Sequence, residues 1–423
     1  MHLQLHHPTA VLQGDIGIES SKSISNRALI INALTNNKCT LTHLSTANDT
    51  LLLQRLLAQQ TTEYNAEDAG TTFRFLTAYL SIQPFDSTLT GTSRMMQRPI
   101  APLVDALRQI GATIQYLKNE GFPPLKILGS KFRQQTSTVA IRADISSQFI
   151  SALLLIAPRL PKGLHINLEG FVTSEPYINM TLAIMQYFSI RYQQTPHTII
   201  IEHQAYQPKL LAVEADWSSA AYYYAMAGIA QSAHIRLRGL TQNSWQGDAV
   251  IASIATFFGV HTYYKNNYIE IKKAAEQLPK SKLFEYDFSN APDIAPTVII
   301  LCAALGIQGL FSGLETLIIK ETDRIAALQV ELQKTGCSLV KLPTRFSKTL
   351  DKEFYLLEGK AHFSDTTTFA TYGDHRMAMG LAALAILHPI NILDTGVVKK
   401  SHPTFWECLK DLAFVVKKYE SSV

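Results

Sequence analysis

The segment Asp374-His375-Arg376-Met377-Ala378 runs directly into a strongly apolar stretch that ends near Leu387. An acidic, hydroxyl or small residue followed at once by alanine, leucine, isoleucine and methionine is typical of a capped helix start. Five other segments share this plan, so the chain contains an internal repeat. They are residues 21–27, 68–76, 144–148, 216–220 and 293–297.

Glycines mark the ends of several predicted helices. Helix-like segments end at Gly111, Gly259 and Gly336 and pass directly into short strand-like runs. Glycine just after the last helical residue suits a helix C-cap. Strand-like alternation also fills residues 197–202 and 268–271. Each repeat is therefore expected to hold both helices and strands.

The spacing of the repeat predicts the domain organisation. Over most of the chain the starts recur at intervals of about 70 to 80 residues, enough for one βαβ-rich unit. Six such units favour two domains of three units over a Rossmann sheet or a solenoid of short repeats. The length of 423 residues agrees with two domains, because one hydrophobic core seldom grows beyond about 250 to 300 residues. We place the break between the halves near residues 211–214.

The composition excludes several classes of protein. Hydrophobic residues make up 47% and charged residues 17%, which excludes a disordered, coiled-coil or collagen-like chain. The 38 Lys and Arg against 34 Asp and Glu occur singly or in pairs, which argues against a nucleic-acid partner. The longest apolar run, residues 298–307, is too short to span a bilayer, so we expect no membrane partner.

The cysteines and the first residues predict a cytoplasmic protein. Four cysteines lie far apart with no CxxC pair, which argues against a zinc site and a disulfide framework. Residues 1–10 show no basic head followed by an apolar stretch. GxGxxG, Walker and GxSxG motifs are also absent, so classical nucleotide-driven and serine-hydrolase chemistry has no support.

Cationic residues gather at the predicted helix starts. In the segment of residues 21–27, Lys22 and Arg27 flank serine hydroxyls, and in residues 89–99 two arginines, Arg94 and Arg98, stand four apart. Lysine supplies a mobile point charge and arginine a planar fork that fits phosphate or carboxylate. Free backbone N–H groups at helix N-termini also attract anions. Solvated, serine-capped helix starts explain these residues equally well, so both interpretations stay open.

Two later segments add groups that can move protons. Lys320-Glu321-Thr322-Asp323-Arg324 holds four charges in five residues just before a helical pattern. It is either a solvated helix start or a site in which Lys320 and Arg324 hold anions while Glu321 acts as acid or base. His375 stands directly beside Arg376 at another helix start, and a histidine among cations is less easily explained by structure alone.

Together and in this order, these segments resemble those of the 5-enolpyruvylshikimate-3-phosphate synthases, a branch of the enolpyruvyl transferase family. The resemblance extends from Ser21 to Lys400. The matching segments are residues 21–27, 69–71 with Arg74, 89–91 with 94–99, 146–149, 246–248, 292–293, 320–324 and 374–379. Any one of them is weak, whereas the ordered set is highly specific.

The resemblance implies a fold and an activity. The fold class is α/β, a two-domain inverse α/β barrel in which each domain has three βαβαββ repeats with buried helices. One domain is residues 20–213, the other is residues 1–19 with 214–423, and the active site lies in the cleft between them. The family transfers the enolpyruvyl group of phosphoenolpyruvate to the 5-hydroxyl of shikimate 3-phosphate and releases phosphate. It needs no metal or organic cofactor, and a monomer is its usual form.

The resemblance also assigns residues of this sequence to roles. Asp293 would be the base for the hydroxyl and Glu321 the acid for the methylene carbon, with Lys22 and His375 supporting proton transfer and charge. Shikimate 3-phosphate would be held by Lys22, Ser23, Arg27, Ser146, Ser147, Gln148, Ser174, Tyr177, Asp293, Thr316 and Lys320. Phosphoenolpyruvate would be held by Lys22, Asp68, Gly70, Arg94, Gln148, Arg324, Arg376 and Lys400.

Three positions depart from the family pattern. Ser20 stands where the family commonly has glycine, and Asp68 and Thr316 where it commonly has asparagine. A carboxylate at Asp68 would repel the anionic donor unless it is paired or protonated. Gly70 is retained, which predicts inhibition by glyphosate, an inhibitor of the family's phosphoenolpyruvate site.

Two alternatives remain open from the sequence. One is the sister enzyme that transfers enolpyruvate to UDP-N-acetylglucosamine, although none of the four cysteines lies in the Gly/Ala/Arg-rich loop that it typically uses. The other is a non-catalytic anion-binding homologue. Retention of Lys22, Asp293, Glu321, His375 and Lys400 speaks against the second alternative.

Overall fold

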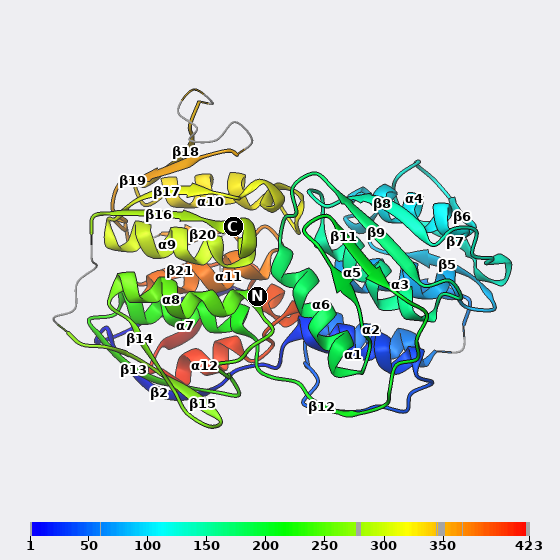
Figure 1. Cartoon of the computed structure of the whole chain (residues 1–423). Coiled ribbons are helices and arrows are strands. Elements are labelled where there is room, and N and C mark those ends of the chain that lie inside the picture. Colours follow the sequence, from blue (N-terminus) through cyan, green and yellow to red (C-terminus); the bar gives the residue numbers. More distant parts are fainter. Residues whose placement is uncertain are drawn as a thin grey trace. The chain divides into compact units, whose positions relative to one another are not determined.

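The chain divides into two compact units in a computed structural model. One unit comprises Ser21–Val213, and the other comprises Met1–Ser20 together with Glu214–Val423. The structure describes residues 2–59, 61–275, 281–343, 345, 352–365 and 367–419. The first unit is called the 21–213 unit. The second, which includes the first twenty residues, is called the 214–423 unit (Figure 1).

In the described part of the chain, the 214–423 unit contains three four-stranded sheets with the same topology. In each, two parallel strands are followed by two antiparallel ones. The first has the order β14 (His261–Tyr264), β15 (Tyr268–Lys273), β13 (Ser232–Arg238), β2 (Val11–Gly17). The second has the order β16 (Leu283–Asp287), β17 (Gln308–Ser312), β19 (Tyr355–Glu358), β18 (Ser338–Lys341). The third has the order β20 (Thr368–Phe369), β21 (Ile390–Ile392), β1 (His2–His6), β22 (Val415–Tyr419).

The 21–213 unit repeats this plan twice and shortens it once. The first full sheet has the order β4 (Glu63–Asn65), β5 (Asp86–Thr90), β7 (Leu125–Leu128), β6 (Ile114–Tyr116). The second has the order β10 (Gln193–Gln194), β11 (Thr198–Ile201), β9 (Leu164–Glu169), β8 (Thr138–Arg142). The third sheet has two parallel strands within the described part of the chain, β12 (Leu210–Ala212) and β3 (Thr40–Thr42). The expected six-fold repeat is therefore present, with one copy abbreviated.

Two helices accompany each sheet (Figure 1). In the 214–423 unit they are α7 (Trp217–Ile229) and α8 (Ile251–Ile254), α9 (Ala295–Leu305) and α10 (Arg324–Gln333), and α11 (His375–Ala382) and α12 (Phe405–Asp411). In the 21–213 unit they are α1 (Lys22–Leu34) and α2 (Asn48–Ala58), α3 (Gly70–Ser81) and α4 (Ala101–Ile110), and α5 (Ser147–Ile156) and α6 (Glu175–Tyr187).

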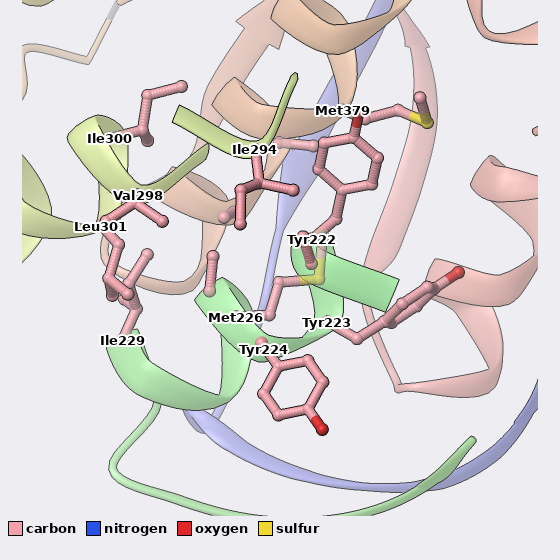
Figure 2. Close-up of a cluster of buried hydrophobic side chains, with 14 of the residues drawn as sticks. Tyr222, Tyr223, Tyr224, Met226, Ile229, Ile294, Val298, Ile300, Leu301 and Met379 are labelled. Carbon is pink, nitrogen blue, oxygen red and sulfur yellow. The ribbon is translucent and has the colours of Figure 1, made fainter. Parts of the chain in front are cut away.

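The first helix of each pair is buried, as predicted. In α7 and α9 nearly every side chain is buried, and in α11 every one is. Such all-round apolarity belongs to helices inside a core. A Cβ atom at Gly228 of α7 would stand 2.9 Å from a methyl carbon of Leu301, so glycine lets α7 and α9 approach closely. In Figure 2, Ile229 of α7 and Leu301 of α9 point toward each other, and Tyr222 points toward Met379 of α11.

Four of the six buried helices are capped by a side chain at the predicted start. Ser21, Ser146, Asp216 and Asp374 accept a backbone N–H from the first turn of α1, α5, α7 and α11. Each cap leaves the remaining N–H groups of the first turn pointing out of the helix end. The free N–H groups at the N-termini of the buried helices can therefore bind polar groups.

At three of the repeat starts the aspartate does not cap the helix. Asp144 pairs with Arg142 at 2.6 Å, and Ser146 takes the cap of α5. Asp68 precedes Ala69, the N-cap of α3, which has no side-chain hydrogen bond. Asp293 lies in a 3-10 turn before α9, where its carboxylate meets cations from other elements. Charged side chains bind the carboxylates of Asp144 and Asp293 more strongly than a backbone N–H group would, so neither aspartate caps a helix.

Candidate active site

Arg324 stands at the centre of an ionic cluster in the 214–423 unit. Asp323 caps α10 by accepting two backbone N–H groups, which makes Arg324 the first helical residue. The Arg324 guanidinium is 1% exposed and meets three carboxylates: Asp374 at 2.7 Å, Asp293 at 3.1 Å and Glu321 at 2.8 Å. Because a buried cation is costly unless its donors are occupied, the three acceptors fix both its position and its charge.

The Arg324 guanidinium stays protonated although it is buried. Burial by itself lowers the pKa of a guanidinium, but the carboxylates of Asp374, Glu321 and Asp293 outweigh it. The net effect raises the pKa of Arg324 above its usual range. The guanidinium therefore remains a permanent positive bridge between the carboxylates.

Three further cations complete the cluster. Asp293 also meets Arg376 at 3.0 Å and the ammonium of Lys320 at 3.7 Å. Glu321 meets the ammonium of Lys400 at 3.7 Å. Burial lowers the pKa of Lys320, while the charge of Asp293 opposes that shift. Four cations and three carboxylates from four separate segments of the chain thus meet in one region.

His375 and Thr316 lie in the same unit. The His375 side chain is 3% exposed, and its Nδ1 atom lies 3.9 Å from an Asp374 carboxylate oxygen. Thr316 belongs to the 3-10 segment Glu315–Ile319 that leads to Lys320. Its buried hydroxyl has no hydrogen-bond partner among the residues that the structure describes.

Asp248 is a buried carboxylate that was assigned no role from the sequence. It is 3% exposed, and one oxygen accepts a hydrogen bond from Ser218 while the other has no hydrogen-bond partner among the described residues. Burial, and secondly the negative charge of Asp293, raises the pKa of Asp248 to about 6. The matched segment of residues 246–248 was the signal that could have found it.

Replacing Asp248 by asparagine is expected to remove a pH-dependent loss of stability. Because the pKa of about 6 exceeds the ordinary value of 3.8, folding favours the protonated acid, and this contribution disappears as the pH rises from about 4 to about 6. Asp248→Asn should therefore gain on the order of 2 kcal/mol over wild type across that interval and keep the gain at pH 7. Urea unfolding at several pH values measures it, with the exposed Asp105→Asn variant as control. A difference between variant and wild type that does not change with pH would contradict the expectation.

The 21–213 unit presents Lys22 at the start of α1. The Lys22 ammonium pairs with Asp49 of α2 at 3.1 Å, and Asp49 is 6% exposed. Ser21 caps the helix, and Ser23 follows Lys22 in the first turn. Asp49 was not among the residues predicted from the sequence, because it lies in the next helix, outside every segment named there.

Arg27 reaches inward from α1 and ties three helices together. Its guanidinium donates to the carbonyl oxygens of Ser23 and Tyr177 at 2.9 and 3.2 Å and to the hydroxyls of Ser151 and Thr181 at 3.2 and 2.7 Å. Burial lowers the pKa of Arg27 to about 10, so it stays protonated at neutral pH. The arrangement fixes the first turn of α1 against α5 and α6.

The starts of α5 and α6 carry the predicted hydroxyl and amide groups. Ser146 caps α5, Ser147 is buried in its first turn, and the Gln148 side chain donates to the Thr71 hydroxyl at 3.3 Å. This contact places the beginning of α5 beside the beginning of α3. Ser174, buried in the left-handed conformation with φ 55°, immediately precedes α6.

Gly70 is the first residue of α3 and admits two arginines. A Cβ atom there would lie 2.6 Å from Nη1 of Arg98 and 2.9 Å from Nη1 of Arg74. Only a residue without a side chain lets both guanidinium groups approach the helix end. Asp68 and Arg94, the other two predicted groups of this region, are exposed.

Each unit thus collects its own predicted residues. Lys22, Ser23, Arg27, Gly70, Ser146, Ser147, Gln148, Ser174 and Tyr177 lie in or directly before the first turn or two of α1, α3, α5 and α6. Asp293, Lys320, Glu321, Arg324, Arg376 and Lys400 meet around one guanidinium or its carboxylates. Among the described residues, no three His, Cys, Asp or Glu side chains form a group that could hold a metal ion.

Comparisons with known proteins cover nearly the whole chain. The family model of EPSP synthase (3-phosphoshikimate 1-carboxyvinyltransferase) matches residues 6–60 and 52–409. A 3-phosphoshikimate 1-carboxyvinyltransferase of Bacteroides fragilis (strain YCH46) is 41% identical over 408 residues, covering 96% of this chain and 97% of the relative. The protein of that name from Sodalis glossinidius is 33% identical over 440 residues, covering 96% of each chain.

The fold agrees with these sequence matches. The solved structure of the EPSP synthase of Acinetobacter baumannii superposes with a TM-score of 0.75, covering 99% of this chain and 100% of that one, at 21% identity. The predicted two-domain enolpyruvyl transferase fold is thereby confirmed. With a family match and full-length relatives of this identity, the chain belongs to the EPSP synthase (3-phosphoshikimate 1-carboxyvinyltransferase) family.

Proposed function

We propose that this protein transfers the enolpyruvyl group of phosphoenolpyruvate to the 5-hydroxyl of shikimate 3-phosphate, with release of phosphate. The observation that carries the proposal is the pair of carboxylates, Asp293 and Glu321, held 3.1 and 2.8 Å from the buried guanidinium of Arg324. Both substrates are anions and the reaction needs one base and one acid, so a cationic cluster with two accessible carboxylates suits it.

Asp293 takes the proton of the 5-hydroxyl. Arg376, Arg324 and Lys320 surround its carboxylate and keep it ionised. As the hydroxyl oxygen bonds to the central carbon of phosphoenolpyruvate, its proton passes to Asp293. The same cations hold the base in place and attract the anionic substrates.

Glu321 gives a proton to the methylene carbon of phosphoenolpyruvate in the same step and so completes a tetrahedral ketal. In the ligand-free protein Arg324 and Lys400 favour its ionised form. Substrate anions that engage the same two cations weaken their hold on the carboxylate and make its protonation easier. In the second step the ketal expels phosphate, and the new methyl group returns a proton to Glu321 to restore the double bond.

The helix starts of the 21–213 unit supply binding groups. Lys22, Gly70, Arg94 and Gln148, with Asp68 beside them, are proposed for phosphoenolpyruvate. Ser23, Arg27, Ser146, Ser147, Ser174 and Tyr177, with Thr316 and Lys320 of the other unit, are proposed for shikimate 3-phosphate. Lys22 and His375 support charge during the reaction. Backbone N–H groups at helix N-termini bind phosphate without further side chains.

Phosphate release from phosphoenolpyruvate tests the proposal. With purified protein we expect release when shikimate 3-phosphate is the acceptor and none when UDP-N-acetylglucosamine replaces it. Release with the nucleotide sugar alone would identify the sister reaction. If no phosphate is released with either acceptor, the proposal is overturned in favour of a non-catalytic anion-binding protein.

Replacing Gly70 by alanine is expected to weaken phosphoenolpyruvate binding. The added methyl group would stand 2.6 Å from Arg98 Nη1 and 2.9 Å from Arg74 Nη1 and would displace both guanidinium groups. We expect the KM for phosphoenolpyruvate to rise by about tenfold or more, the effect of losing one charged contact, with little change in the KM for shikimate 3-phosphate. Gly17→Ala is a suitable control, since its Cβ would make an ordinary contact at 3.6 Å. Equal KM values in wild type and Gly70→Ala would remove Gly70 from the proposed site.

Compartment and oligomeric state complete the proposal. We propose a cytoplasmic monomer, in keeping with the family resemblance. All four cysteines are free thiols, which suits a reducing compartment. Within the described ranges no helix is both long and apolar enough to cross a membrane. Light scattering at working concentration measures the mass of the particle, and a stable dimer would contradict the proposal.

A further inference from the structure

Glu331 is a fully buried carboxylate that the proposed reaction does not use. It lies in α10, seven residues after Arg324, and it is 0% exposed. Residues seven apart in a helix lie two turns apart on the same face. A glutamate is seldom buried unless its oxygens are paired or hydrogen-bonded. The partners of Glu331 therefore show which part of the fold it holds.

Three donors occupy the Glu331 carboxylate. The ammonium of Lys334 donates to it at 2.7 Å and to the carbonyl oxygen of Thr368 at 3.0 Å. The other two donors are the backbone N–H of Ala370 at 3.1 Å and the hydroxyl of Tyr372 at 2.6 Å, both just before α11. Burial, and secondly Glu331, raises the pKa of Tyr372 to about 12, so the hydroxyl keeps its proton at neutral pH. One carboxylate thus holds this segment at two points.

The segment before α11 makes a turn that is unfavourable for tyrosine. The N–H of Asp374 donates to the carbonyl oxygen of Thr371 at 2.9 Å, which closes a turn with Tyr372 and Gly373 at its centre. Both central residues have positive φ, 55° and 68°. Glycine adopts such angles freely, whereas a bulky side chain rarely does. The bond from the tyrosine hydroxyl to Glu331 therefore supports a backbone conformation that tyrosine alone disfavours.

This turn leads directly into groups of the proposed active site. Asp374 caps α11 and lies 2.7 Å from the Arg324 guanidinium. Arg376, in the first turn of α11, pairs with the carboxylate of Asp293 at 3.0 Å and donates to the carbonyl oxygen of the same residue at 3.2 Å. Helix α10 thus contacts this part of the chain twice, once through Arg324 and once, two turns later, through Glu331.

We propose that Glu331 and Tyr372 are positioning residues whose hydrogen bond keeps the turn before α11 in the conformation that places Arg376 for phosphoenolpyruvate. Neither residue is proposed to touch a substrate. The ligand of Arg376 rests on the proposed function, whereas the hold on the turn rests on the contacts described above. Without the hydroxyl bond, residue 372 can leave the positive-φ region, and the Arg376 guanidinium shifts with the start of α11.

The experiment compares Tyr372→Phe with Tyr372→Asn in the full chain. Phenylalanine keeps the ring and removes only the hydroxyl, so the turn loses its support while the unfavourable φ remains. Asparagine also lacks the tyrosine hydroxyl, but it tolerates positive φ. Tyr355→Phe is the matched control, because it removes a hydroxyl bond to Glu353 of 3.1 Å in the same unit. The thermal midpoint, kcat and the KM for each substrate are measured.

We expect Tyr372→Phe to raise the KM for phosphoenolpyruvate about tenfold, the effect of a misplaced binding group, and the KM for shikimate 3-phosphate less than about twofold. Tyr372→Asn should lie closer to wild type, since asparagine fits the turn without the bond. Glu331→Gln keeps one acceptor oxygen in place of two and should raise the KM for phosphoenolpyruvate by a smaller factor than Tyr372→Phe. Tyr355→Phe should keep both KM values of wild type.

Two results would overturn the inference. A lower thermal midpoint in Tyr372→Phe with unchanged KM values would assign the bond to stability alone. Equal increases of the KM for phosphoenolpyruvate in Tyr372→Phe and Tyr372→Asn would show that the hydroxyl itself matters, rather than the conformation of the turn.

Failure of the proposed function is distinguishable from failure of the positioning role. The rise of the thermal midpoint with increasing phosphoenolpyruvate measures binding without turnover. If wild type binds phosphoenolpyruvate more tightly than Tyr372→Phe does but releases no phosphate from it, the positioning role stands and the proposed reaction fails.

Discussion

Glu321→Gln is expected to release phosphate from phosphoenolpyruvate about 10²- to 10⁴-fold more slowly than wild type, the usual contribution of a positioned acid or base. Glutamine keeps the size of the side chain and can still accept a hydrogen bond from Arg324, which lies 2.8 Å from the carboxylate. What it cannot do is give a proton to the methylene carbon. The loss should therefore fall on kcat, with KM values for both substrates near those of wild type.

Glu315→Gln provides the matched control for this variant. Glu315 lies six residues earlier, and its carboxylate accepts a backbone N–H at 3.0 Å from Glu353. We expect full activity for it. If Glu321→Gln instead keeps kcat and raises KM, Glu321 binds substrate rather than transferring a proton, and the acid must be sought elsewhere in the cluster.

Arg324→Met is expected to destabilise the protein by about 3–5 kcal/mol, the usual result of removing one partner from a buried ion pair. The reason lies in Asp374, which is 0% exposed and would lose the guanidinium that pairs with it at 2.7 Å. Such a loss is a large fraction of the stability of most proteins. Thermal and urea unfolding measure the effect. Arg236→Met, which breaks a 45% exposed pair with Asp15, should cost less than about 1 kcal/mol.

A double variant separates charge from packing at this site. In Arg324→Met/Asp374→Asn the uncompensated carboxylate is gone, and asparagine can still cap α11 by accepting the N–H of Arg376. We expect the double variant to recover part of the lost stability. Like Arg324→Met, it should release no phosphate from phosphoenolpyruvate. Equal destabilisation in the single and double variants would show that Arg324 matters for its volume rather than its charge.

The repeat could be predicted from the sequence because each copy is a local pattern. A helix start and the apolar residues that follow it lie within about ten positions of each other, and a buried helix requires that composition. Gly111 and Gly259 likewise end their helices in the left-handed conformation, at φ 111° and 78°, as glycine permits. The expected capped start is absent at α9, because the partners of Asp293 come from other elements.

The sequence could not predict which residues pair with one another when they lie far apart in the chain. Arg324 meets Asp374 and Asp293, which are 50 and 31 positions away, and nothing in their local patterns specifies the contact. The place of Arg98 beside Gly70 is of the same kind, since a loop and a helix end must first fold together. The shortened third sheet of the 21–213 unit was also unforeseen, because its copy has the same kind of helix start as the others.

The order of strands along the chain dictates an order of assembly during synthesis. Strands β1 and β2 are made first, yet β1 pairs with β21 and β22 and β2 pairs with β13, all of which leave the ribosome after the entire 21–213 unit. That unit is one continuous segment and completes its sheets with strands of its own. It can therefore fold while the rest is still being translated, whereas the first seventeen residues must wait with open strand edges. Unpaired edges invite association with other chains. An mRNA truncated before β22 thus yields a 21–213 unit with all of its strands and a 214–423 unit whose third sheet lacks β22.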